Sequence, residues 1–227
     1  MLPAIAVLAA AGFWWWRRPL DPIVVPAVAW RVGTDAAGGF RQGINYDDVA
    51  PETAIRMQFR CDEPRHVYVF SHSLEDGTLL LFPSPQVKSD LANPIPAGAQ
   101  VLPGKRDGKD LAWNSRRQVS ATTTFLVVAS TQPIAALDAL LPRLRRWTNT
   151  ALTDGSMQVM NPPDGERAAG PRTALPEALL QRAAEVSFTA EVINGPLAPD
   201  PLLPDVWIGS WRIRETAAAP PEPPKNR

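Results

Sequence analysis

Residues 53–60 have the sequence TAIRMQFR, in which apolar and polar side chains alternate almost without interruption. A period of two is typical of a β-strand, because successive side chains of a strand point to opposite faces of its sheet. Ile55, Met57 and Phe59 should therefore face a core, while the residues between them face water. This stretch predicts a strand that is buried on one side only.

A β-hairpin is predicted directly after this strand. Residues 66–72 have the sequence HVYVFSH, which is rich in β-branched and aromatic side chains, and residues 78–82 have the sequence TLLLF. The acidic and glycine-containing residues 75–77 between them are typical of a tight turn. Pro83 ends the second strand, since proline has no backbone N–H to donate to a ladder.

Further along the chain, the pattern continues to favour strands. Residues 122–131 contain the continuous apolar run FLVVA, which suits a strand buried on both faces. Shorter strands are expected at 100–102 and 111–113, separated by a charged loop at 104–110, and a closing pair of strands at 187–193 and 205–215. Leucines spaced by three and four residues predict a helix from about residue 130 to Trp147, and a second helix is expected at 173–185. The predicted fold is therefore mainly β, an antiparallel sandwich-like or barrel-like domain over residues 31–215 with two peripheral helices and an N-terminal membrane helix.

The N-terminus carries a membrane signal. Every residue from 2 to 16 is apolar, proline or glycine, and the run ends in Phe13, Trp14, Trp15, Trp16, Arg17 and Arg18. As a helix it would cover only about 20–25 Å of the roughly 30 Å hydrocarbon core, but tryptophans and arginines can lie in the headgroup layer. We expect residues 1–18 to be a single-pass anchor, 19–30 a proline-containing spacer and 216–227 a disordered proline-rich tail.

The side of the membrane on which the domain lies depends on few charges. The positive-inside rule would keep Arg17 and Arg18, and with them the domain, in the cytoplasm. A further basic segment upstream of Met1 would reverse this orientation and place the domain in the periplasm, which is the location we expect. A cleaved signal peptide is disfavoured, because no positive region precedes the apolar run.

Little in the sequence indicates catalysis or a cofactor. Lys plus Arg and Asp plus Glu number 23 each, so no net charge favours nucleic acid as a partner. One cysteine cannot form an intramolecular disulfide or a cysteine metal cage, and no nucleotide, metalloprotease or nucleophile-elbow motif is present. We expect no enzyme activity, no cofactor and no metal. A hydrolase with His66 or His72 as base and Ser71 or Ser84 as nucleophile is the alternative.

Four aromatic residues are candidates for an interaction surface. Phe40 and Tyr46 lie in the loop-like segment 35–46, and loops with aromatic residues often anchor interfaces. Trp207 and Trp211 share one face of the last predicted strand, where they form either a recognition edge or part of the core.

Residues 55–140 resemble the bacterial family catalogued as domain of unknown function 4384 (DUF4384). The resemblance rests on the succession of short motifs HVYVF at 66–70, DG at 76–77, LLFP at 80–83, NPIPAG at 93–98, LP at 102–103 and FLVVAS at 125–130, followed by Pro133. It implies a small β-rich module that accompanies membrane segments, kinases or protease-like domains as an accessory or sensory part, without catalytic residues.

These observations together predict a non-catalytic, membrane-anchored bacterial accessory or sensing module. Its expected partners are a protein or another cell-envelope component, and the membrane itself through residues 2–18. A structural subunit of an envelope assembly is a further alternative, which would show as a large apolar patch on the isolated domain.

Overall fold

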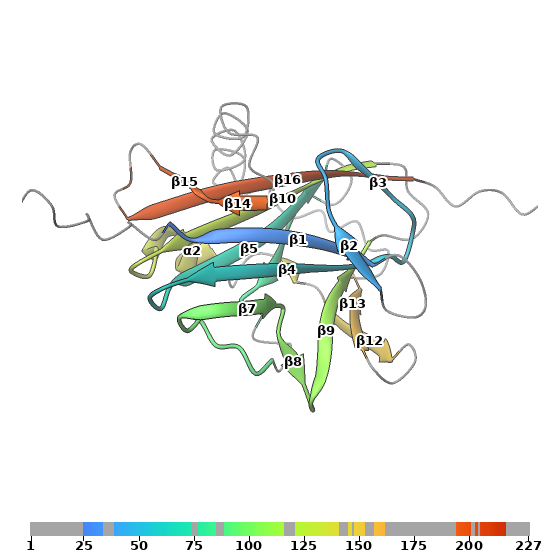
Figure 1. Cartoon of the computed structure of the whole chain (residues 1–227), viewed down its shortest axis with the longest axis horizontal. Helices are drawn as coiled ribbons and strands as arrows, with labels where there is room; N and C mark the ends of the chain where they lie inside the picture. Colours follow the sequence, from blue (N-terminus) through green and yellow to red (C-terminus); the bar gives the residue numbers. More distant parts are fainter. Residues whose placement is uncertain are drawn as a thin grey trace, which may run out of the picture.

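The computed structural model describes residues 25–33, 39–73, 77–84, 89–115, 121–140, 145–146, 148–152, 157–161, 194–200, 203 and 205–216. Over these residues the protein is mainly β, as predicted, with two sheets and one helix, α2 (Ala135–Leu140) (Figure 1).

Sheet A has nine strands, with the order β12-β13-β9-β4-β1-β14 and with β2, β7 and β8 paired to β1, β4 and β9. Its members are β1 (Ala27–Gly33), β2 (Phe40–Gln42), β4 (Ala54–Cys61), β7 (Gly98–Leu102), β8 (Lys105–Arg106), β9 (Lys109–Asn114), β12 (Thr148–Leu152), β13 (Met157–Asn161) and β14 (Asn194–Pro196). β2 and β14 pair with successive parts of the same edge of β1, and β13 runs parallel to β9.

Sheet B has seven strands in the order β11-β6-β5-β10-β16-β15, with β3 also paired to β16. Its members are β3 (Asp47–Val49), β5 (His66–Ser73), β6 (Gly77–Phe82), β10 (Ala121–Ser130), β11 (Arg145–Arg146), β15 (Ala198–Pro199) and β16 (Val206–Glu215). The predicted hairpin is confirmed, because β5 and β6 pair antiparallel. The strand predicted at 205–215 is confirmed as β16, which pairs antiparallel with β10 along its whole length, and β15 and β3 pair with its other edge.

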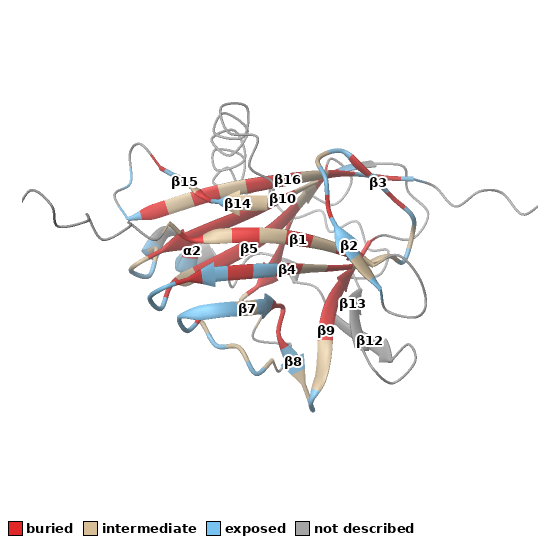
Figure 2. Cartoon of the chain, in the orientation of Figure 1, coloured by how far each residue is buried: buried red, intermediate tan, exposed pale blue. Residues whose placement is uncertain are grey.

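The main core lies between the two sheets and follows the period-two pattern of the sequence (Figure 2). Ile55, Met57 and Phe59 are fully buried, as the alternation in β4 predicts. Aromatic rings fill the centre of this core: Trp30 of sheet A lies 4.9 Å from Trp211 of sheet B, centroid to centroid. Burial of such large apolar side chains is the main force that holds the two sheets together.

A second apolar cluster covers the other face of sheet B. Its members are Tyr68, Phe70, Leu80, Leu126, Val128, Leu137, Val206 and Ile208. The run at 125–129 is thus buried on both faces, as predicted. Leu137 comes from α2. Tyr68 holds this helix in place, because the Tyr68 hydroxyl donates a hydrogen bond to Asp138 at 3.0 Å and accepts one from the N–H of Ile134 at 3.3 Å.

Three expectations need correction. The helix predicted to reach Trp147 ends at Leu140. Arg145 and Arg146, which this prediction placed at the end of the helix, instead form β11 and pair in parallel with β6. The charged stretch 104–110 is no simple loop, because β8 and β9 form a hairpin in it. The spacer assigned to 19–30 is too long: β1 starts at Ala27, and Trp30 is a core residue with 1% exposure.

Several expected segments lie outside the described residues. These are the anchor at 1–18, the hairpin turn at 75–76, the helix at 173–185, the strand at 187–193 and residues 217–227 of the tail. Of the helices in the described ranges, none has the length and apolar character that a membrane span requires.

Candidate functional site

One open side between the two sheets is closed by two chain crossings. Residues 43–46 connect β2 of sheet A to β3 of sheet B, and Leu197 connects β14 to β15 beside them. Leu197 points inward, is 2% exposed, and occupies the space that a side chain at Gly209 would need. Ile44, in the other crossing, is 61% exposed. We call residues 43–46 the exposed turn.

The exposed turn is held in place by backbone hydrogen bonds at Gly43, Ile44 and Tyr46. The N–H of Gly43 donates to the carbonyl of Trp30 at 2.9 Å, and the side-chain amide of Asn194 donates to the carbonyl of Gly43 at 2.9 Å. The N–H of Tyr46 donates to the carbonyl of Arg212 at 2.7 Å. Because these bonds reach both sheets, the turn has little freedom to collapse onto the surface.

Trp211 forms the floor of the exposed turn. Its indole N–H donates to the carbonyl of Ile44 at 2.7 Å, and its ring is fully buried. The ring stacks on Trp30 and, with centroids 5.2 Å apart, on Phe125. Gly43 is required at this point, since a Cβ atom there would lie 2.8 Å from the Trp211 ring.

The outer surface of the turn combines apolar and cationic groups. Tyr46 is 45% exposed, beside the more exposed Ile44. The guanidinium of Arg212 lies 5.9 Å from the centre of the Tyr46 ring and donates to its hydroxyl at 3.1 Å. Tyrosine and arginine are enriched among residues that dominate the energy of protein interfaces.

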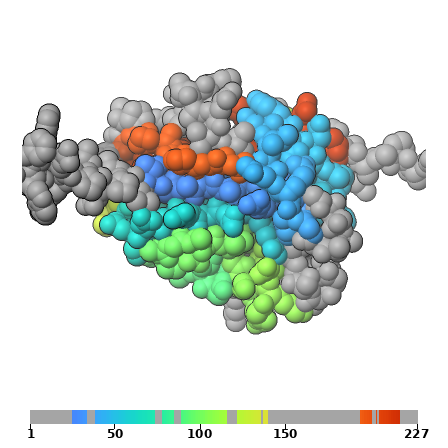
Figure 3. Space-filling model, in the orientation of Figure 1, coloured from blue at the N-terminus to red at the C-terminus, as the bar shows by residue number. Residues whose placement is uncertain are grey.

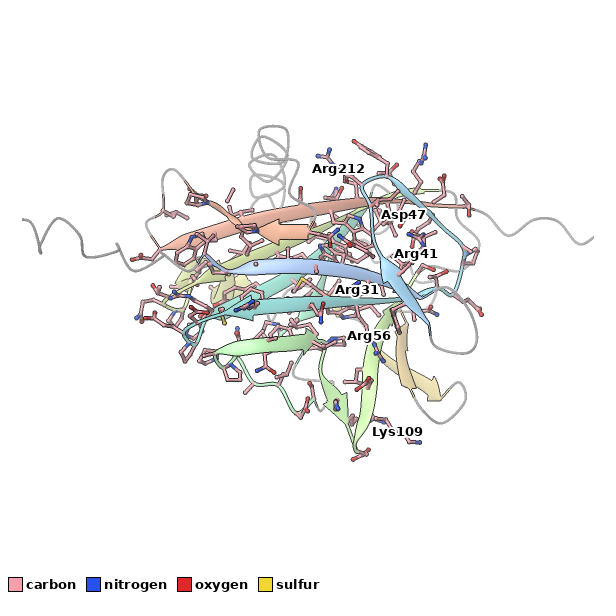
Figure 4. The ribbon with its side chains drawn as sticks, in the orientation of Figure 1. Arg31, Arg41, Asp47, Arg56, Lys109 and Arg212 are labelled. Carbon is pink, nitrogen blue, oxygen red and sulfur yellow. The ribbon has the colours of Figure 1, made fainter. Side chains whose placement is uncertain are left out.

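A buried carboxylate braces the turn from its flank. Arg41 of β2 donates to both carboxylate oxygens of Asp47 of β3, at 2.5 and 2.6 Å, so this pair links sheet A to sheet B (Figure 4). Asp47 is 6% exposed. Its hydrogen bonds raise the pKa of the Arg41 guanidinium above the ordinary value, and this charge-assisted, two-point contact fixes the flank of the turn.

Phe40 lies on the outer face of sheet A, away from the turn. Arg56 of β4 covers its ring at 4.5 Å and donates to Asp110 of β9 at 3.1 Å. Burial lowers the pKa of Arg56, although the neighbouring Asp110 opposes this shift. The three side chains connect β2, β4 and β9, which gives Phe40 a structural role.

The four predicted interaction residues therefore lie in different environments and do not form one surface. Tyr46 belongs to the exposed turn, and Trp211 lies beneath it, fully buried and unable to contact a partner directly. Trp207 lies four residues earlier in β16, where the guanidinium of Arg65 covers its ring at 4.9 Å. Sequence reasoning missed Ile44, although an isoleucine between Gly43 and Asn45 in a turn is a recognisable signal.

The predicted catalytic pairs are not formed among the described residues. His72 contacts Thr78 at 3.0 Å, while Ser71 points to the opposite face of β5, into the main core. The hydroxyl of Ser84 is buried and has no hydrogen-bond partner in the part of the chain that the structure describes. Cys61 is buried, and its burial raises the pKa of the thiol. In the described ranges no three His, Cys, Asp or Glu side chains are placed to hold a metal ion.

Comparison with known proteins adds no assignment: the chain matches no family model, no curated protein and no solved structure.

Proposed function

We propose that this protein is a non-catalytic, membrane-anchored interaction module whose β domain binds a protein partner of the cell envelope through the exposed turn. The observation that carries the proposal is the combination of rigidity and exposure at residues 43–46. The backbone is fixed by both sheets, yet Ile44 and Tyr46 are 61% and 45% exposed. A rigid apolar tip loses little conformational entropy on binding, which favours affinity.

Residues 43–46 could close the open side of the sandwich without exposing the side chain of Ile44. Leu197, in the neighbouring crossing, shows that an apolar residue at this edge can point inward and fill the core. Besides Ile44 and Tyr46, the large apolar residues exposed in the described part of the chain are Val101 and Leu203, each 41% exposed. A small tip of this kind suits a reversible partner better than permanent burial in an assembly.

Site-specific photo-crosslinking in living cells of the native host tests the proposal. A photoreactive phenylalanine replaces Ile44 in one variant of the full chain and Leu203 in the control variant. We expect discrete crosslinked products of defined mass from position 44 and none from position 203. Equal products from both positions, or none from position 44 in a well-expressed protein, would refute the assignment of the turn.

The membrane part of the proposal rests on residues 2–18, with Trp14, Trp15 and Trp16 followed by two arginines. A reporter that is active only outside the cytoplasm, fused after Arg227, tests the orientation. Activity would place the β domain in the periplasm, as we propose. Silence from a well-expressed, membrane-bound fusion would place it in the cytoplasm, and recovery of the full chain in the soluble fraction would exclude the anchor.

The succession of motifs that resembles DUF4384 supports an accessory role of the same kind, since that resemblance implies a module without catalytic residues. Hydrolysis of ester substrates by the full chain that is lost on replacing His72 with alanine would refute the non-catalytic role.

A further inference from the structure

On the outer face of sheet A, strands β1 and β4 carry cations on a floor of small residues, flanked by Val101 of β7, the cross-strand partner of Gln58, and by Phe40 of β2. The outward positions of β1 are Ala27, Ala29, Arg31 and Gly33, and those of β4 are Ala54, Arg56, Gln58 and Arg60. This face is the near side of the molecule in the space-filling view (Figure 3). Among these eight positions there is no carboxylate and no large apolar side chain.

Two of these arginines oppose each other directly. Arg31 of β1 and Arg56 of β4 are cross-strand partners, and like charges in such a pair destabilise a sheet. Asp110 neutralises Arg56, whereas Arg31 donates to the uncharged side-chain amide of Gln58 at 3.2 Å. Arg60 is exposed and forms no ion pair within the described ranges. The face thus keeps positive charge that the fold does not require.

The hairpin β8–β9 carries charges of both signs beside this face (Figure 4). Lys105 is 58% exposed, and Arg106 and Lys109 lie near it. The carboxylates here are Asp90, Asp107 and Asp110, as many as these cations, so the hairpin is balanced and the excess positive charge lies on Arg31 and Arg60. Because the whole chain has a formal net charge of +0, this face concentrates cations that are balanced elsewhere.

The composition of the face indicates the chemistry of its ligand. The centre of a protein interface is usually depleted of charge and enriched in aromatic residues, which is the reverse of this surface. Nucleic-acid surfaces offer aromatic rings for base stacking, but Arg56 already covers Phe40. Guanidinium groups bind phosphate oxygens through paired hydrogen bonds.

We propose that the outer face of sheet A binds a linear phosphodiester polymer without bases, of the polyol-phosphate type. Arg31 and Arg60 contact phosphates of the polymer, and the alanines between them let the polymer backbone lie close to the sheet. This site is separate from the exposed turn and does not depend on the function proposed for it. Each phosphate contact releases counterions, so binding weakens steeply with salt.

Titration of the full chain, in non-ionic detergent, with poly(glycerol phosphate) tests this site. Poly-L-glutamate and single-stranded DNA with the same number of charges are the competing ligands. We expect the phosphate polymer to bind most tightly. Arg31→Gln and Arg60→Gln should each weaken binding about fivefold and reduce the slope of log affinity against log salt by about one.

Arg214→Gln is the matched control, because Arg214 is exposed on sheet B and pairs with Asp48. Its removal changes the net charge equally and should leave binding of the polymer unchanged. An unaltered urea midpoint shows that each variant is folded. The proposal is overturned by no binding, by equal or tighter binding of poly-L-glutamate or DNA, or by an equal loss in Arg214→Gln. Polymer binding that persists when Ile44 is replaced separates this site from the exposed turn.

Discussion

Replacing Gly43 with alanine tests whether Trp211 fixes the exposed turn. The new Cβ atom would lie 2.8 Å from Cζ2 and 3.2 Å from Cε2 of Trp211, and 3.3 Å from Cβ of Trp30. The indole cannot move aside, because it is buried and stacks on Trp30 and Phe125. The turn itself must shift outward, which lengthens the 2.7 Å hydrogen bond from Trp211 to the carbonyl of Ile44.

The size of the effect follows from these contacts. Overpacking a well-packed site costs about 1–3 kcal/mol, and weakening one buried hydrogen bond adds about 1 kcal/mol. The reduced freedom of alanine in the unfolded chain offsets about 0.4–1 kcal/mol of this loss. We therefore expect Gly43→Ala to lower the free energy of unfolding by about 2–3 kcal/mol.

Urea denaturation of the full chain, followed by tryptophan fluorescence, measures this loss, and hydrogen exchange of residues 43–47 locates it. Gly209→Ala is the control, because its new methyl group meets the flexible end of Leu197 in the neighbouring crossing. It should cost less and leave exchange in the exposed turn unchanged. Equal losses in the two variants, or unaltered exchange at 43–47 in Gly43→Ala, would show that Trp211 does not fix the turn.

Three further outcomes follow from buried polar groups. Asp47→Asn should lower the free energy of unfolding by about 1–3 kcal/mol, because Asp47 is 6% exposed and accepts two hydrogen bonds from Arg41. An equal loss of stability in the exposed Asp48→Asn variant, measured by thermal denaturation, would contradict this. Burial raises the pKa of Tyr68 to about 12, whereas a tyrosine in the unfolded chain has a pKa of about 10. The folded protein then keeps a proton that the unfolded chain has lost, so stability should fall between about pH 10 and 12. Tyr68→Phe should lack this component, and an identical pH dependence in that variant would disprove it. Cys61, buried and with a raised thiol pKa, should resist iodoacetamide at pH 8 until urea unfolds the chain, and rapid labelling of the native protein would contradict its burial.

The local pattern of the chain predicted much of the β architecture. The alternation in 53–60 identified the buried face of β4, and the run at 125–129 identified a strand covered on both sides. The hairpin of β5 and β6 followed from strand composition and its turn residues. These features are local, because side-chain direction in a strand changes at every residue whichever strands are its neighbours.

Local pattern failed where a segment joined a distant partner. Arg145 and Arg146, predicted at the end of a helix, form β11 because a parallel partner, β6, is available. The segment predicted as a spacer contains the start of β1, whose partners are β4, β2 and β14. Strand pairing depends on the neighbour as much as on the segment itself.

The candidate site shows the same division. The sequence by itself determined that Tyr46 lies in a loop and that Trp211 lies in a strand. Only the tertiary structure decided that Trp211 supports the turn from below, through a hydrogen bond between residues 167 positions apart. Likewise, the chain is neutral as a whole, and only the pairing of β1 with β4 places Arg31 beside Arg56 on one face. Contacts between residues so far apart are set by strand order and register, which a short stretch of sequence does not contain.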